Sequence, residues 1–225
     1  MLISLAAALA YSGFDSLLHR QVSGRILALE GSATMNQSVH LTSESFFKAG
    51  DTIATAANSR LDLMLVPQVL LALGPDTEIA VDHLHLKRDG NESIRPMTAR
   101  HAAITLRRGT LVVTLGQAQT EPGLRIKTPI GTVTSGPAQT FEVRVEGDQL
   151  SIFCVRGAAI FRSQSSPAHV EVGAGSFATF PPPDAVPQRA ALAGAAAQAK
   201  VPALLRVEKR LLRLQAEKLL AYRPW

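Results

Sequence analysis

The sequence has little of what catalytic, metal-binding and membrane-spanning proteins commonly use. Its 225 residues include one cysteine, Cys154, which excludes an intramolecular disulfide and any metal site built from several cysteines. Aromatic residues make up only 5%, so nucleic-acid binding by base stacking is disfavoured. No run of 18 apolar residues occurs, so no bilayer-spanning helix is predicted. Hydrophobic residues still reach 46%, which is enough for a packed core.

Motifs that carry chemistry are also missing. The sequence has no Gly-x-Ser-x-Gly elbow, no phosphate-binding Gly-x-x-x-x-Gly-Lys loop and no His-Glu-x-x-His pair. We therefore predict a protein that is not an enzyme, with no catalytic, cofactor-binding or metal-binding residues and no cofactor.

The net charge of +5 belongs to the C-terminal tail. Residues 189–225 hold eight Lys or Arg and two Asp or Glu, a net of +6, which leaves −1 for residues 1–188. An electrostatic partner is therefore expected at the tail, and nucleic acid is not expected, because only one short helix is basic.

The first ten residues resemble the apolar core of a secretory signal peptide. They end in Ala8-Leu9-Ala10, a typical cleavage pattern, before Tyr11. The basic start of such a signal is missing, since no Lys or Arg precedes Arg20. The alternative is that this segment begins a buried N-terminal helix. We expect a periplasmic or secreted protein of the bacterial envelope.

From Gly24 to about Phe180 the sequence is typical of an all-β domain. Short runs rich in β-branched and apolar residues alternate with Gly, Pro, Asn and Asp. The predicted strands are Arg25–Leu29, Thr52–Thr55, Leu61–Val66, Val69–Leu73, Glu78–Leu86, Ala102–Leu106, Leu111–Leu115, Leu124–Thr128, Gly131–Ser135, Thr140–Glu146, Gln149–Val155, Ala158–Arg162, His169–Val172 and Phe177–Phe180.

The clearest local prediction is a hairpin. Residues 141–146 alternate apolar and charged side chains, and Gly147-Asp148 then supplies a two-residue loop that needs positive φ. The fold class predicted is mainly β, either a sandwich or a twisted β-solenoid or β-roll-like stack of short strands, with a C-terminal amphipathic α-helix.

The division of the chain follows composition. We expect an N-terminal apolar segment at 1–23, a β domain at 24–180, a Pro/Ala-rich linker at 181–199 and a basic amphipathic helix at 200–225. The helix has three possible partners. Its leucines could cap an open end of the β stack, it could pair with a partner helix, or it could bind an anionic membrane surface, with Tyr222 and Trp225 suiting the first or third.

The β region resembles the FecR domain in the order and spacing of its motifs over about residues 24–180. The matching segments are Gly24–Ala33, Gly50–Thr55 with Asn58–Leu63, Leu71–Ile79, Leu106–Leu111, Ile126–Gly131, Phe141–Val143, Val155–Ala159 and Val172–Gly175. Two segments depart from the pattern. The family's Asp-Gly-Ser turn is here Val66-Pro67-Gln68, and its Gly-Thr before Phe141 is replaced by residues 136–140.

The resemblance implies a non-catalytic envelope domain that takes part in protein–protein contact and signal relay. The cytoplasmic anti-sigma helices and the membrane span of the best-known members do not occur in this sequence. We expect Asp51 to accept hydrogen bonds in a turn, and the interior of the domain to be filled by Ile53, Leu61, Leu63, Leu71, Leu73 and Ile79.

Three sets of residues deserve testing as sites. His83 and His85 leave the same face of one strand and, with His101 elsewhere, could hold a metal, or they could simply be its solvent side. Cys154 could face outward as a nucleophile or be structural. Asp51, Asp62 and Asp76 could form an acidic cluster for glycan cleavage, or cap turns.

The favoured function is a non-catalytic protein-binding or signal-sensing module whose partner is another envelope protein. The alternative is a β-solenoid protein that binds or hydrolyses cell-wall or extracellular polysaccharide. The sequence names neither the ligand nor the oligomeric state.

Overall fold

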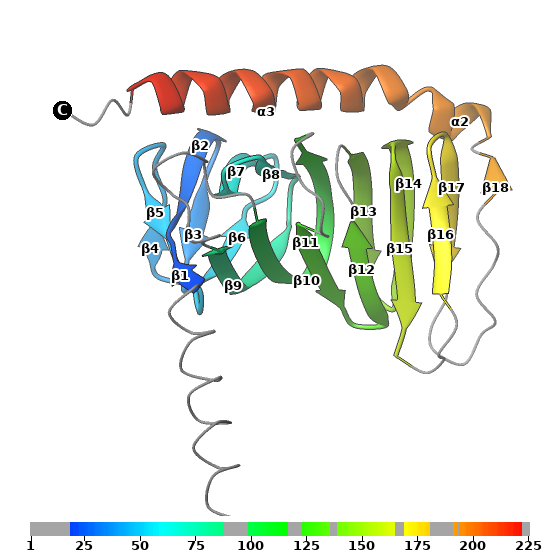
Figure 1. Ribbon diagram of the computed structural model, residues 1–225, viewed down its shortest axis with the longest axis horizontal. Coiled ribbons are helices and arrows are strands. Elements are labelled where there is room, and N and C mark those ends of the chain that lie inside the picture. Colours follow the sequence, from blue (N-terminus) through cyan, green and yellow to red (C-terminus); the bar gives the residue numbers. More distant parts are fainter. Residues whose placement is uncertain are drawn as a thin grey trace, which may run out of the picture.

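Strands make up most of the chain, and a long helix follows them (Figure 1). The computed structural model describes residues 19–87, 99–116, 123–135, 139–164, 169–180, 191–192 and 194–221. The strands are β1 (His19–Gln21), β2 (Gly24–Glu30), β3 (Ala33–Met35), β4 (Val39–His40), β5 (Phe46–Phe47), β6 (Thr52–Thr55), β7 (Arg60–Val66), β8 (Val69–Leu73), β9 (Glu78–Lys87), β10 (Ala99–Leu115), β11 (Leu124–Thr128), β12 (Gly131–Ser135), β13 (Thr140–Glu146), β14 (Gln149–Arg156), β15 (Ala158–Ser163), β16 (His169–Gly173), β17 (Ser176–Phe180) and β18 (Ala191–Leu192). The helices are α2 (Ala195–Gln198) and α3 (Val201–Ala221).

The strands form two sheets that share β10. Sheet A runs in the order β4-β3-β6-β9-β10-β11-β12-β15-β16, with β1 also paired to β9. Sheet B runs β5-β2-β7-β8-β10-β13-β14-β17-β18. The first part of β10, up to Arg108, pairs with β9 in sheet A, and the part from Gly109 pairs with β8 and β13 in sheet B.

The main core lies between the two sheets. Inward side chains alternate with outward ones along β11, β12 and β13, as expected for strands with one buried face. The six residues predicted to fill the interior are all fully buried, which confirms that prediction: Ile53, Leu61, Leu63, Leu71, Leu73 and Ile79.

The second face of sheet B is covered by α3. All five residues of β8 are buried, and Leu70 and Ala72 point away from the main core into a smaller cluster with Leu204 and Leu211 of the helix. The helix crosses the sheet toward its N-terminal strands (Figure 1): Glu208 pairs with Arg156 on β14, and Lys218 reaches Glu44 next to β5. The molecule is therefore layered as helix, sheet B and sheet A.

The mainly β fold with a C-terminal amphipathic helix is confirmed. The predicted hairpin is also present, since Glu146 pairs with Gln149 around a two-residue loop in which Gly147 has φ +57°. The solenoid shape is not confirmed. Repeated solenoid rungs stack strands in parallel, whereas in the described residues only β10 and β11 pair in parallel.

Two predictions need correction. The residues predicted as separate strands 102–106 and 111–115 belong to one strand, because Gly109 turns β10 from one sheet to the other without ending it. The helix docks on the protein's own domain, but along the face of sheet B and not on an open end. The sheet face offers α3 a continuous apolar surface across several strands.

Some predictions fall on residues that the structure does not describe. The predicted signal peptide lies within residues 1–18, most of the predicted linker within 181–190, and Tyr222 and Trp225 within 222–225.

Candidate functional site

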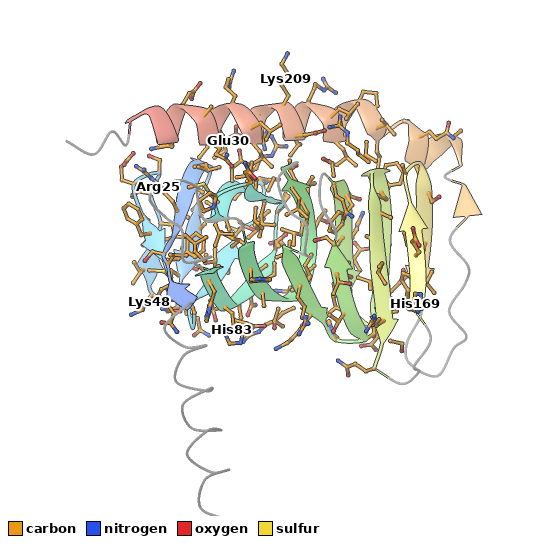
Figure 2. The ribbon with its side chains drawn as sticks, viewed as in Figure 1. Arg25, Glu30, Lys48, His83, His169 and Lys209 are labelled. Carbon is orange, nitrogen blue, oxygen red and sulfur yellow. The ribbon has the colours of Figure 1, made fainter. Side chains whose placement is uncertain are left out.

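The histidines predicted on β9 form part of a larger group on the outer face of sheet A. The rings of His83 and His85 meet edge to face with their centres 5.8 Å apart. His101 was expected elsewhere, but β9 and β10 pair in a register that sets it directly opposite His85. Figure 2 shows His83 on the side of the molecule opposite to α3.

A hollow of about 580 Å³ lies beside these histidines. Its polar lining comes from five strands, β9, β10, β11, β12 and β15, and consists of His83, His85, His101, Arg125, Thr134 and Arg162. Pairing explains the shape, because the small side chain of Ala103 lies between His83 on β9 and Arg125 on β11, and so leaves a depression between two long side chains. Arg125 in turn pairs with Thr134 on β12.

A metal site does not form from the predicted residues. Within the part of the chain that the structure describes, no group of three His, Cys, Asp or Glu side chains is placed to hold a metal ion. The two arginines of the hollow are also unfavourable neighbours for a cation. The hollow is therefore better suited to an anion.

Cys154 faces inward, which corrects the expectation that it might face out. Its side chain is fully buried in the main core, while Phe153 points to the α3 side, so the two do lie on opposite faces as predicted. Burial raises the pKa of the Cys154 thiol to about 11. Its sulfur lies 3.3 Å from the carbonyl oxygen of Arg156. This is a structural cysteine.

The native protein should therefore be almost inert to thiol reagents. At pH 7.5 we expect Ellman's reagent to modify the folded protein at least about a hundredfold more slowly than the protein in 6 M guanidinium, because the reactive thiolate is scarce and inaccessible. A colour-development time course measures this. Rapid stoichiometric modification of the folded protein would contradict the burial of Cys154.

The three aspartates serve separate structural roles. Asp51 accepts hydrogen bonds from the backbone N–H of Lys48 (2.8 Å) and the side chain of Asn36 (2.9 Å), which confirms its predicted turn role. Asp62 is buried and receives two hydrogen bonds from Arg210 of α3. Asp76 is exposed in a turn at φ +50°. The pair of free carboxylates that glycan cleavage requires does not form from them.

The basic residues of α3 divide between the sheet and solvent. Arg210 and Lys218 of α3, together with Lys200 just before the helix, pair with acids of the β domain. Arg206, Lys209 and Arg213 are exposed, and Lys209 projects away from the strands (Figure 2). No helix in the described residues is long and apolar enough to cross a membrane.

The turn Val66-Pro67-Gln68, which differs from the FecR motif, contacts α3. Gln68 follows Pro67 at φ +69°, a backbone conformation that usually takes glycine. Its backbone N–H donates to Oε1 of Gln215 on α3 at 3.1 Å. The turn thus keeps its geometry without the family's glycine and contacts the helix.

One pair of edge strands exposes apolar side chains. β4 and β5 lie at the same end of the molecule (Figure 1), and Val39 and Phe46 on them are 48% and 55% exposed. The guanidinium of Arg25 lies 5.3 Å from the centre of the Phe46 ring. Among described residues, β4 pairs only with β3 and β5 only with β2, so each leaves one edge open. Sequence patterns did not indicate this end, because both strands are only two residues long.

Comparison with known proteins supports the resemblance to the FecR domain over part of the chain. The model of the FecR protein family matches residues 51–159. Two crystal structures, at 1.65 and 2.50 Å, of a candidate anti-sigma factor from Parabacteroides distasonis ATCC 8503 are similar in fold, each with 11% identity and a TM-score of 0.48. The similarity covers 68% of this chain and 63–64% of theirs, so this chain spans less than two thirds of their length. No curated protein matches the sequence. Over residues 51–159 the chain is therefore similar to the FecR protein family, which confirms the resemblance that the sequence motifs indicate there.

Proposed function

We propose that this protein is a non-catalytic, protein-binding and signal-sensing module of the bacterial cell envelope. The observation that carries the proposal is the FecR family match over residues 51–159, since that family is regulatory. The separate structural roles of Cys154, Asp51 and Asp62 support a binding role over a catalytic one.

The partner-binding surface in this proposal is the end formed by β4 and β5. Open strand edges can accept a strand or loop from another chain through main-chain hydrogen bonds, and exposed apolar side chains add affinity there. Val39 and Phe46 provide such side chains beside the two open edges. Sheet B is less available for a partner, because α3 covers its outer face.

A photocrosslinking experiment in intact cells tests this proposal. A photoreactive phenylalanine analogue is placed at Phe46, at Asp148 in the exposed β13–β14 loop, or at Lys209 on the outer side of α3. We expect position 46 to give one dominant adduct with another envelope protein, and position 148 to give none. Cell fractionation should recover that adduct with the envelope.

The other outcomes decide against the proposal. Equal adducts at positions 46 and 148, or none at either, would exclude the β4/β5 end as a specific surface. A dominant adduct at position 209 alone would assign binding to the helix. Recovery of the protein in the cytoplasmic fraction would contradict the envelope location.

A further inference from the structure

The hollow on sheet A is built by five adjacent strands, β9, β10, β11, β12 and β15, and is not a gap at a loop. Its floor is the outer surface around Ala103, and the row His83–Ala103–Arg125–Thr134 runs across β9, β10, β11 and β12 as neighbouring pairs. Because hydrogen-bonded strands fix these positions, the side chains are held around one point.

The chemistry of the lining points to an anion. The polar groups that line the hollow are three imidazoles, two guanidiniums and a hydroxyl. No carboxylate, Trp, Tyr or Phe side chain is among the lining residues. Guanidinium groups donate paired hydrogen bonds that match the oxygens of carboxylate and phosphate groups. Neutral sugars commonly stack on aromatic faces, and this lining offers no Trp, Tyr or Phe for that purpose.

We propose that this hollow binds a small soluble oxyanion, the carboxylate or phosphate group of a ligand of about sugar-phosphate size. Arg125 and Arg162, both exposed, hold the charged group, and Thr134 lines the hollow beside Arg125 while its hydroxyl donates to the carbonyl oxygen of Ile160 at 3.4 Å. The volume lies within the range of about 300–1,000 Å³ usual for ligand sites. This site is separate from the β4/β5 surface, so it extends the proposed function and does not depend on it.

The charged groups around the hollow keep it cationic. Asp82 on β9 is engaged elsewhere, since Thr105 donates to it at 3.0 Å and Lys127 pairs with it at 3.3 Å. At the far side lies β16. In the register of β15 and β16, His169 is opposite Arg162 and Glu171 is opposite Ile160.

Calorimetric titration of the full chain with inorganic pyrophosphate, in 150 mM NaCl at pH 6, tests the site. We expect saturable 1:1 binding that weakens about tenfold for each arginine removed, and so about a hundredfold in Arg125→Ala/Arg162→Ala. The matched control is Arg60→Ala/Arg206→Ala, which removes the same charge from exposed arginines outside the hollow and should leave the affinity unchanged.

Three results would overturn the site. These are absence of saturable binding to the wild-type protein, equal losses in both double variants, or binding only to phosphatidylglycerol vesicles in a sedimentation assay. The last result would assign the basic face to a lipid surface instead of a soluble ligand.

Discussion

Replacing Gly109 with alanine is expected to destabilise the protein by about 4 kcal/mol, the sum of a backbone strain and a steric overlap. Gly109 has φ +95°, a conformation that residues with a Cβ rarely adopt. A Cβ built there would lie 2.4 Å from Oγ1 and 2.5 Å from Cα of Thr77. Both distances are shorter than the 3.0 Å below which a Cβ essentially never approaches a non-bonded atom.

Thr77 cannot move away to relieve this overlap. It is fully buried, and its Oγ1 accepts a hydrogen bond from the backbone N–H of Thr110 at 3.0 Å. Its own N–H donates to Oγ1 of Thr55 at 2.9 Å. These bonds join the turn before β9 to the point where β10 passes between the sheets, so the strain would reach both layers.

Urea unfolding followed by circular dichroism measures the effect, with Gly147→Ala as the control. Gly147 also has positive φ, +57°, but an added Cβ there has no atom within 4 Å. The control should therefore lose only about 1 kcal/mol, the cost of the backbone conformation. Equal losses in the two variants would show that the contact with Thr77 contributes nothing.

The sequence predicts the regular strands well because their signal is local. Short runs rich in β-branched and apolar residues, bounded by Gly, Pro or Asp, predicted β6, β8, β11, β12 and β13 with the bounds that the structure has. The same method missed β3, β4 and β5, which have only two or three residues. A segment that short shows no period, and its pairing is decided by the strands beside it.

The position of α3 could have been inferred from β8. The run Val69–Leu73 is apolar at every position, which is typical of a strand buried on both faces. A second layer therefore had to cover sheet B, and the only long amphipathic segment available was the C-terminal helix. The helical period alone shows that α3 has an apolar side, but it does not show which surface that side contacts.

The grouping of His101 with His83 and His85 depends on register, which sequence spacing does not provide. The β9–β10 pairing contains an irregularity next to Asp82, where Val81 and His83 pair with the consecutive residues Ile104 and Ala103. Such an irregularity changes which side chains share a face. Arg125 and Arg162 come from β11 and β15, which are still more distant in sequence. The sequence alone therefore could not predict that these side chains line one hollow.

Replacing Arg210 with methionine is expected to lower the free energy of unfolding by about 3–5 kcal/mol at pH 7.5. The Arg210 guanidinium donates two hydrogen bonds, of 2.7 and 2.8 Å, to the carboxylate of Asp62, whose side chain is only 3% exposed. Methionine preserves much of the apolar stem of Arg210 while leaving the buried carboxylate without its partner. Arg213→Met is the control, because Arg213 and Glu217 form an exposed pair expected to contribute less than about 1 kcal/mol.

The loss in Arg210→Met should shrink as the pH falls. Burial raises the pKa of Asp62, and the hydrogen bonds from Arg210 oppose that rise, so removing Arg210 raises the pKa further. Between the pKa of Asp62 in the unfolded chain and its higher pKa in the folded protein, the folded state binds more protons. Stability in that window therefore falls as the pH rises, and more steeply in the variant. Urea unfolding at pH 4.0, 5.5 and 7.5 measures this. An equal loss at all three pH values would show that the unpaired charge of Asp62 is not its cause.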